Sequence, residues 1–216
     1  MKKYKIINVV GARPNFMKIA PLQREMDKFK NQITYKLVHT GQHYDKNMSD
    51  NFFNDLKMQA PNYFLGINSG SHAVQTAKIM IEFEKVLLKE KLDLIIVTGD
   101  VNSTIVCALV AVKLDIKIAH IEAGCRSFDR TMPEEINRIL TDSISDFLFA
   151  IDDISVTNLI NEGIPKNKIF LVGDIMIDSL IYGIKKIKID DSLLNLYNLQ
   201  PNNYCVLTLH RPSNVD

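Results

Sequence analysis

The sequence has 216 residues, of which 46% are hydrophobic, enough to bury the core of one complete α/β domain with a remnant of another. Its 26 basic and 25 acidic residues leave a formal charge of +1, without the basic excess that usually marks binding to nucleic acid or an anionic membrane. No apolar run approaches the roughly 20 residues that span a bilayer, and the chain starts directly with a strand and a turn. We therefore expect a cytoplasmic protein whose partner is a small molecule.

The three cysteines, Cys107, Cys125 and Cys205, are scattered and odd in number. This pattern fits neither a disulfide framework nor the paired spacing of a zinc site. Cys125 lies in a loop of interest, but no base is evident beside it, and a lone cysteine is far more often a packing residue than a nucleophile. We predict reduced cysteines and no metal site.

Short apolar, β-branched runs alternate along the chain with stretches of helical character. The strand-like runs cover residues 4–10, 33–39, 92–98, 117–122, 147–151 and 169–172. The helical stretches cover residues 14–30, 71–91, 102–115, 133–145, 155–162 and 175–186. Pro14 and Pro133 suit the first turn of a helix, where a missing N–H does no harm. The alternation predicts an α/β fold with a doubly wound, parallel, Rossmann-like sheet.

The composition becomes polar towards the end of the chain. We predict a first domain over residues 1–188, a linker with a short helix over residues 189–203, and the start of a second, nucleotide-binding domain over residues 204–216. Residues 204–209 read as one more strand. One strand with one turn cannot form its own core, so we expect this stretch either to pack on the first domain or to be poorly ordered.

Ligands of open parallel sheets bind beyond the carboxyl ends of the strands, and polar residues follow several strands here. Arg13 and Lys18 lie at the start of a helix, where each cation opposes the helix dipole at a cost of about 0.3–1 kcal/mol. A phosphate would resolve this conflict, and the alternative is that both side chains extend into water. His43 follows the second run and lies either in the cleft or, as is commoner for a loop histidine, on the surface.

Two carboxylates follow neighbouring runs. Asp100 follows residues 92–98, and either it or Asn102 is a helix cap, or Asp100 is a general base. Glu122 ends the next run, which lies beside the Asp100 strand in the usual strand order. Carboxylates brought together in a cleft tend to separate their pKa values, so that one donates a proton and the other accepts one. This pair is the strongest chemical signal in the residues alone.

Two further places are weaker signals. Glu134 begins a helix four residues before Arg138, and an acid there favours the dipole, so a purely structural role is the simpler interpretation. His210 and Arg211 follow residues 204–209, where either could meet a phosphate or a proton in transit.

Five motifs carry a family resemblance: GARPNFMKIAPL, TGQHYD, VTGDVNST, HIEAGCRSFDRTMPEEINR and TLHRPSNVD. In this order and spacing, from Gly11 to the last residue, the chain resembles the non-hydrolysing UDP-N-acetylglucosamine 2-epimerases of bacteria and archaea. The resemblance implies two Rossmann-like domains of the glycosyltransferase type, with the substrate held in the cleft between them. It implies that this chain supplies the first domain and the first strand of the second.

The resemblance also implies roles for individual residues. Arg13 and Lys18 match positions near the sugar and diphosphate, and His43 and Arg211 are expected to line the same cleft. The carboxylates implicated in catalysis match Asp100, Glu122 and Glu134, and the histidine contributed by the second domain matches His210.

The implied reaction is reversible inversion at C2 of UDP-N-acetylglucosamine, giving UDP-N-acetylmannosamine, without a cofactor and in a homodimer. The C2 proton is removed and UDP is expelled to give a 2-acetamidoglucal, and UDP then adds back with protonation from the opposite face. A carboxylate base and a second acid fit these proton transfers. Cations fit the charge that builds on the departing diphosphate.

Family members continue for a further domain of roughly 150 residues, within the usual range for a domain, which holds most of the nucleotide contacts. We therefore expect this chain alone to bind UDP weakly and to turn over little. Three alternatives stay open: a non-catalytic module that pairs with a separate C-terminal half, a hydrolysing relative that releases N-acetylmannosamine and UDP, and an epimerase for a more heavily modified UDP-N-acetyl sugar.

Overall fold

The computed structural model describes residues 2–41, 56–67, 70–186 and 192–209. Its internal contacts divide the chain into two units, Met1–Ile181 and Tyr182–Asp216. The first unit contains the sheet and the residues that follow its strands.

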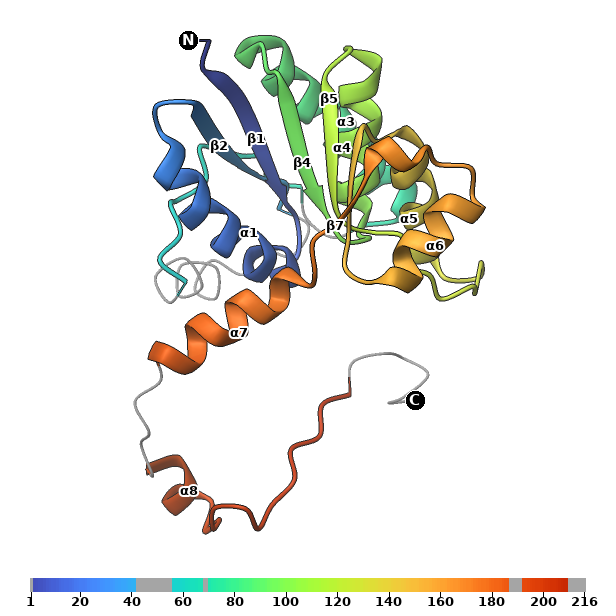
Figure 1. Ribbon diagram of the computed structural model, residues 1–216. Helices are drawn as coiled ribbons and strands as arrows, with labels where there is room; N and C mark the ends of the chain where they lie inside the picture. Colours follow the sequence, from blue (N-terminus) through green and yellow to red (C-terminus); the bar gives the residue numbers. More distant parts are fainter. Residues whose placement is uncertain (1, 42–55, 68–69, 187–191, 210–216) are drawn as a thin grey trace. The chain divides into compact units, whose positions relative to one another are not determined.

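Among the described residues, seven strands form one sheet in the order β3-β2-β1-β4-β5-β6-β7, and all neighbours are parallel (Figure 1). The strands are β1 (Tyr4–Val10), β2 (Ile33–His39), β3 (Tyr63–Phe64), β4 (Leu94–Thr98), β5 (Lys117–Ala123), β6 (Phe147–Ala150) and β7 (Ile169–Leu171). The chain moves outward from β1 to β3 and returns to β4 beside β1. This order confirms the predicted doubly wound, Rossmann-like sheet. Only β3 was not predicted, because two residues are too few to show a pattern.

The described helices also match the predicted positions, with ends that differ by a few residues. They are α1 (Arg13–Met26), α3 (His72–Glu90), α4 (Asn102–Lys113), α5 (Pro133–Ile144), α6 (Asp153–Asn161), α7 (Ile175–Lys186) and α8 (Ser192–Leu196), with the short 3-10 helices η1 (Asp27–Phe29) and η2 (Lys166–Lys168). Pro14 and Pro133 lie in first turns, as expected. Within these described segments, no helix is both long and apolar enough to cross a membrane.

The two faces of the sheet pack into different cores. On one face, α3 and α4 bury side chains such as Phe83 against Ile7 and its neighbours. On the other face, α1 buries Phe16 and Ile19 against Ile6 and its neighbours (Figure 1). Ile6 and Ile7 are adjacent in β1 and enter opposite cores, because successive side chains of a strand point to opposite faces. Coverage of both faces explains why the strands read as continuous apolar runs.

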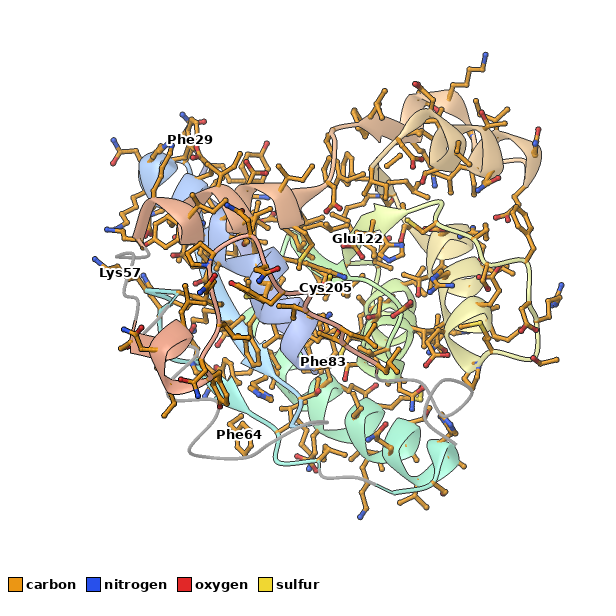
Figure 2. The ribbon with its side chains drawn as sticks, turned by 90° about the horizontal axis from the view of Figure 1, so that it is seen from below. Phe29, Lys57, Phe64, Phe83, Glu122 and Cys205 are labelled. Atoms are coloured by element: carbon orange, nitrogen blue, oxygen red, sulfur yellow. The ribbon has the colours of Figure 1, made fainter. Side chains whose placement is uncertain are left out.

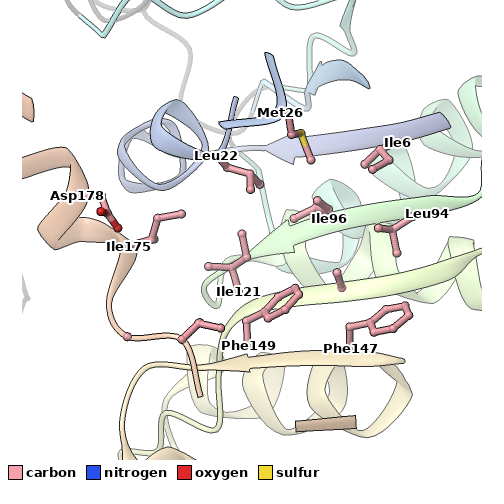
Figure 3. A pocket seen from close by; sticks show the side chains of 13 residues that line it. Ile6, Leu22, Met26, Leu94, Ile96, Ile121, Phe147, Phe149, Ile175 and Asp178 are labelled. Atoms are coloured by element: carbon pink, nitrogen blue, oxygen red, sulfur yellow. The ribbon is translucent and has the colours of Figure 1, made fainter. Parts of the chain in front are cut away.

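A pocket of about 510 Å³ lies on the α1 side of the sheet, over β4, β5 and β6 (Figure 3). Ile96, Ile121 and Phe149 form its sheet wall, and Ile175 of α7 faces them. Asp178 is the only charged residue among those that line it. Since binding sites for polar ligands need several convergent polar groups, this pocket is not the candidate site.

The predicted strand over residues 204–209 is absent. These residues are described without strand pairing, and their side chains are exposed, including Val206 and Leu207. Strand propensity alone cannot supply a partner for the backbone N–H and C=O groups of an isolated segment. The short helix expected just before it is present as α8.

The cysteines are free, with Cys107 buried, Cys125 half-buried and Cys205 exposed. Burial raises the pKa of the Cys125 thiol. The thiolate is the nucleophilic form, so this environment favours packing over catalysis at Cys125.

Two glycines with left-handed backbone differ in their surroundings and provide a test of packing. Gly124 (φ 82°) lies so close to α6 that an added Cβ would stand 2.3 Å from the carbonyl oxygen of Ser155. Gly163 (φ 84°) has no atom within 4 Å of its added Cβ.

We expect Gly124→Ala to lower the free energy of unfolding by about 3 kcal/mol, because it combines left-handed strain with a clash. Gly163→Ala is the matched control and should lose only about 1 kcal/mol, the cost of the backbone conformation. Urea unfolding of both variants measures the difference. Equal losses would contradict the close approach of Gly124 to Ser155.

His39, the last residue of β2, is buried between two aromatic rings. Its ring centroid lies 5.2 Å from that of Phe16 and 5.2 Å from that of Phe64, and its Nδ1 accepts a hydrogen bond from the Gly41 N–H at 2.8 Å. Burial lowers the pKa of His39 from 6.5 to about 4. The side chain is therefore neutral in the folded protein at neutral pH.

This burial makes the fold sensitive to acid. The unfolded chain binds a proton at His39 near pH 6.5 and the folded chain only near pH 4, so stability is complete above the first value and is lost as the pH falls towards the second. The loss should reach about 3 kcal/mol, and His39→Gln should remove it. Urea unfolding of both proteins across this pH window measures the difference. If both proteins lost the same stability as the pH falls, a group other than His39 would be responsible for the acid sensitivity.

Candidate active site

The strand order reverses between β1 and β4, and open α/β sheets bind ligands at such a switch point. Asn15 joins the ends of these two strands. Its Oδ1 accepts hydrogen bonds from the N–H groups of Gly11 (3.1 Å) and Ala12 (2.9 Å), and its Nδ2 donates to the carbonyl oxygen (3.1 Å) and Oγ1 (2.9 Å) of Thr98. All four hydrogen-bonding positions of the buried amide are used. The carboxyl edge is thus rigid where β1 meets β4.

Glu122 is turned out of the regular strand by a bulge. The register of β5 with β6 shifts between Ile121 and Ala123, and Glu122 has φ 68°, a conformation that costs a non-glycine residue about 1–2 kcal/mol. Regular alternation would point Glu122 to the same face as His120. Instead its Oε2 lies 2.5 Å from Nζ of Lys18 in α1. Bulges near active sites commonly redirect a side chain in this way.

The Lys18–Glu122 ion pair lies beside the end of β4. A Cβ added to Gly99 would stand 3.1 Å from Lys18 Nζ and 3.8 Å from Glu122 Oε2. Figure 2 looks onto this edge of the sheet and labels Glu122. Gly99 leaves room for the ion pair because it has no side chain. Asp100 is the next residue in the chain. Lys18 was expected to interact unfavourably with the dipole of α1. The Glu122 carboxylate offsets this interaction, so the anion is part of the protein.

Asp100 is held from the other side, by α5. Its carboxylate forms an ion pair with Arg138, and its backbone oxygen accepts a hydrogen bond from Asn137 Nδ2 at 2.8 Å. The N-cap of α4 is Val101, without a side-chain cap. Asp100 is therefore not a helix cap.

Arg138 is a site residue that the sequence did not single out. Its Nη1 lies 2.8 Å from Glu135 Oε2, so it joins Glu135 to Asp100 rather than pairing with Glu134, four residues before it. The spacing of three residues between Glu135 and Arg138 was a readable signal, but an equally common helical spacing pointed to Glu134.

Glu135 is a fixed anion under the loop after β5. Burial acts to raise the pKa of its carboxyl, but hydrogen bonds from Ser127, Arg138 and Phe128 outweigh burial and hold the pKa below its usual value. The backbone N–H groups of Ser127 and Phe128 both donate at 3.0 Å. Glu135 therefore fastens the loop to α5.

The remaining predicted residues are not brought together by the described structure. Glu134 is half-buried, and within the described part of the chain its carboxylate joins neither ion pair. His43, His210 and Arg211 lie outside the described residues, as does the side chain of Arg13. Their roles stay predictions. In the segments that the structure describes, no three His, Cys, Asp or Glu side chains could hold a metal ion.

Residues 25–216 match a family model described as UDP-N-acetylglucosamine 2-epimerase. The chain belongs to this epimerase family. A "UDP-N-acetylglucosamine 2-epimerase homolog" of Methanococcus maripaludis is 50% identical to the epimerase-family chain over 213 residues, which are 98% of this chain and 58% of the relative. The chain thus spans somewhat more than half the length of the curated relatives that it matches.

The fold of this epimerase-family chain also matches solved structures. The crystal structure of Methanocaldococcus jannaschii UDP-GlcNAc 2-epimerase in complex with UDP-GlcNAc and UDP is 47% identical, with a TM-score of 0.85 over 90% of this chain and 53% of that chain. A Pseudomonas aeruginosa relative, UDP-2,3-diacetamido-2,3-dideoxy-D-glucuronate 2-epimerase, is 42% identical over 98% of this chain and 59% of its own length. The family resemblance and the Rossmann-like fold are confirmed.

Breaking the Lys18–Glu122 pair from one side should destabilise the epimerase-family chain. Lys18→Met leaves a largely buried carboxylate without its partner, at an expected cost of about 2 kcal/mol, and adding Glu122→Gln should recover part of this loss. Urea unfolding of both single variants and the double variant measures the coupling. Strictly additive losses would show that the two side chains do not interact in solution.

Proposed function

We propose that this chain is the carboxylate-bearing half of an enzyme that interconverts UDP-N-acetylglucosamine and UDP-N-acetylmannosamine without a redox cofactor. One observation carries the proposal: Asp100, just after β4, and Glu122, near the end of β5, lie at the carboxyl ends of adjacent strands, and each is held by its own cation. The M. jannaschii relative, crystallised with UDP-GlcNAc and UDP, supports a UDP-sugar as the ligand.

The chemistry needs two proton transfers on opposite faces of C2. One carboxylate removes the C2 proton while the bond between C1 and UDP breaks, which leaves a 2-acetamidoglucal and free UDP. UDP then bonds again to C1, and a second acid returns a proton to C2 from the other face. A carbon acid is weak, so the base must lie within hydrogen-bond reach. Asp100 and Glu122 are the proposed pair, and Glu134 is a third candidate in the same reaction.

The departing diphosphate needs positive charge where its own charge builds up. Lys18 lies beside the end of β4 and is the described cation best placed for this, because its partner Glu122 and the switch point are both adjacent. Arg13 is proposed to act with it. His43, His210 and Arg211 are proposed to line the same cleft.

The domain arrangement is part of the proposal. Residues 1–188 would form one wall of the cleft, residues 189–203 a linker, and residues 204–216 the start of a nucleotide-binding domain that supplies the second wall. That domain would belong to the same polypeptide or to a separate one. From the family resemblance we further propose that the complete enzyme is a cytoplasmic homodimer, which sedimentation analysis of the complete enzyme can test.

Activity is expected only when both walls of the cleft are present. This chain alone should convert little or no UDP-N-acetylglucosamine, whereas joining it to the C-terminal domain of the M. maripaludis relative should give an active assembly. Proton NMR of the sugar region distinguishes substrate and product. Sustained epimerisation by this chain alone would contradict the requirement for a second wall.

Asp100→Asn should lower kcat of the active assembly by at least about 100-fold, because an amide cannot take part in proton transfer. Asp146→Asn is the matched control. It makes the same chemical change just before β6, where Asp146 contacts Lys117 Nζ (2.9 Å) and the Ile118 N–H (3.1 Å) at the start of β5, and it should leave turnover unchanged. Full activity of Asp100→Asn would make Asp100 a structural residue.

The 42% identity to the P. aeruginosa relative favours a second candidate, an epimerase for a more heavily modified UDP-N-acetyl sugar. Offering the active assembly UDP-N-acetylglucosamine and UDP-2,3-diacetamido-2,3-dideoxy-D-glucuronate at equal concentration decides between the two. Release of UDP and N-acetylmannosamine in equal amounts would instead identify a hydrolysing enzyme.

A further inference from the structure

A row of four ionisable side chains of alternating type lies under the end of β5. His120 of β5 and Asp142 of α5 are buried, with Nδ1 of the imidazole 2.6 Å from Oδ1 of the carboxylate. Asp142 Oδ2 lies 2.7 Å from Nη2 of Arg126. Arg126 in turn meets Glu162, after α6, through Nη2–Oε2 (2.6 Å) and Nε–Oε1 (2.7 Å) contacts. The proposed reaction uses none of these four residues.

Both ring nitrogens of His120 face acceptors. Nε2 lies 2.8 Å from the carbonyl oxygen of Gly99, which can only accept, so Nε2 carries a proton. Nδ1 faces Asp142, whose other oxygen already accepts from Arg126 and from the Gly124 N–H at 3.0 Å. An ionised carboxylate can only accept, so Nδ1 carries a proton as well.

Asp142 is the ionised partner in this contact. Burial acts to raise the pKa of its carboxyl, but His120 and Arg126 outweigh burial and hold the pKa below its usual value. A neutral imidazole would place a bare nitrogen lone pair against the Asp142 carboxylate or the Gly99 carbonyl, at a side chain that is fully buried. A protonated His120 would give the row two cations and two anions in alternation, and pairing of this kind is how a buried charge such as Asp142 is tolerated.

We propose that His120 is a doubly protonated imidazolium that positions the two carboxylates of the active site through the backbone. The inference rests on the proposed function, because it assigns Asp100 and Glu122 to the reaction. Gly99 immediately precedes Asp100, and Gly124 comes two residues after Glu122. His120 holds the carbonyl of Gly99 directly and, through Asp142, the N–H of Gly124.

This backbone needs such support because regular pairing ends there. Gly99 and Gly124 have φ of 65° and 82°, and the register of β5 with β6 shifts between Ile121 and Ala123, just before Gly124. One backbone bond, from the Gly99 N–H to the Ile121 oxygen at 3.1 Å, still joins the two ends. The charged row binds two further backbone groups of these turns, the Gly99 carbonyl and the Gly124 N–H. His120 is thus a positioning residue and does not touch the substrate.

The charge state can be measured on this chain without any activity. Imidazole nitrogen-15 NMR at neutral pH should show two protonated nitrogens for His120, with its signals assigned by their loss in His120→Gln. Asp142→Asn should leave one nitrogen without a proton, since the counter-charge is gone. Asp146→Asn, four residues after Asp142 and just before β6, should change nothing. A bare ring nitrogen at His120 in the unaltered chain overturns the proposal, even if a variant fails to fold.

Amide hydrogen exchange tests the positioning role in a reciprocal way. Asp142→Ala, which removes the acceptor oxygen, should speed exchange at Gly124 and not at Ile118, whereas Asp146→Ala should do the opposite, because Asp146 accepts from the Ile118 N–H. Unchanged exchange at Gly124 in folded Asp142→Ala overturns the positioning role.

Turnover in the active assembly adds a kinetic readout. Asp142→Asn should lower kcat by about tenfold or more with a smaller change in KM, because the carboxylates are misplaced while binding groups remain. A normal kcat also overturns the positioning role. An assembly that converts no UDP-sugar would defeat the proposed function, and the NMR and exchange results would still decide the state of His120.

Discussion

The arrangement of the carboxyl edge depends on one side-chain amide. Asn15 binds the backbone at the end of β1 with its oxygen and the end of β4 with its nitrogen, so the two strands that flank the switch point cannot separate. Because Asn15 also lies in α1, it fixes the helix that carries Lys18. A neutral, fully hydrogen-bonded amide provides this rigidity without adding charge to an edge rich in ions.

The two carboxylates owe their different surroundings to backbone geometry. Glu122 would point to the same face as His120 if β5 continued regularly, rather than towards Lys18. The left-handed backbone of Glu122 at the bulge costs about 1–2 kcal/mol, and it places the carboxylate on the α1 side. His120, two residues earlier, keeps the regular direction and contacts Asp142 in the charged row. One interruption in a strand thus places Glu122 beside Lys18 and His120 beside Asp142.

Much of this was readable in the sequence, for identifiable reasons. Apolar runs of strand length and first-turn prolines such as Pro133 reveal α/β order, since both reflect local constraints. Asp100 and Glu122 could be placed at neighbouring strand ends because parallel strands end at one edge. Three features could not be predicted, because they depend on packing between segments of the chain that the sequence pattern does not relate. They are the bulge at Glu122, the ion pair of Arg138 with Glu135 rather than Glu134, and the partners of His120. Residues 204–209 misled for the same reason: they have strand propensity but no partner.

The two cations that hold the carboxylates belong to different layers, Lys18 to α1 and Arg138 to α5. Substitutions in either helix can therefore change the position of one carboxylate while leaving the other almost untouched. Under the proposed function, the two proton transfers could then change separately as relatives of this chain diverge towards different sugars. Because the sheet separates α1 from α5, evolution can change the surroundings of Glu122 and of Asp100 independently.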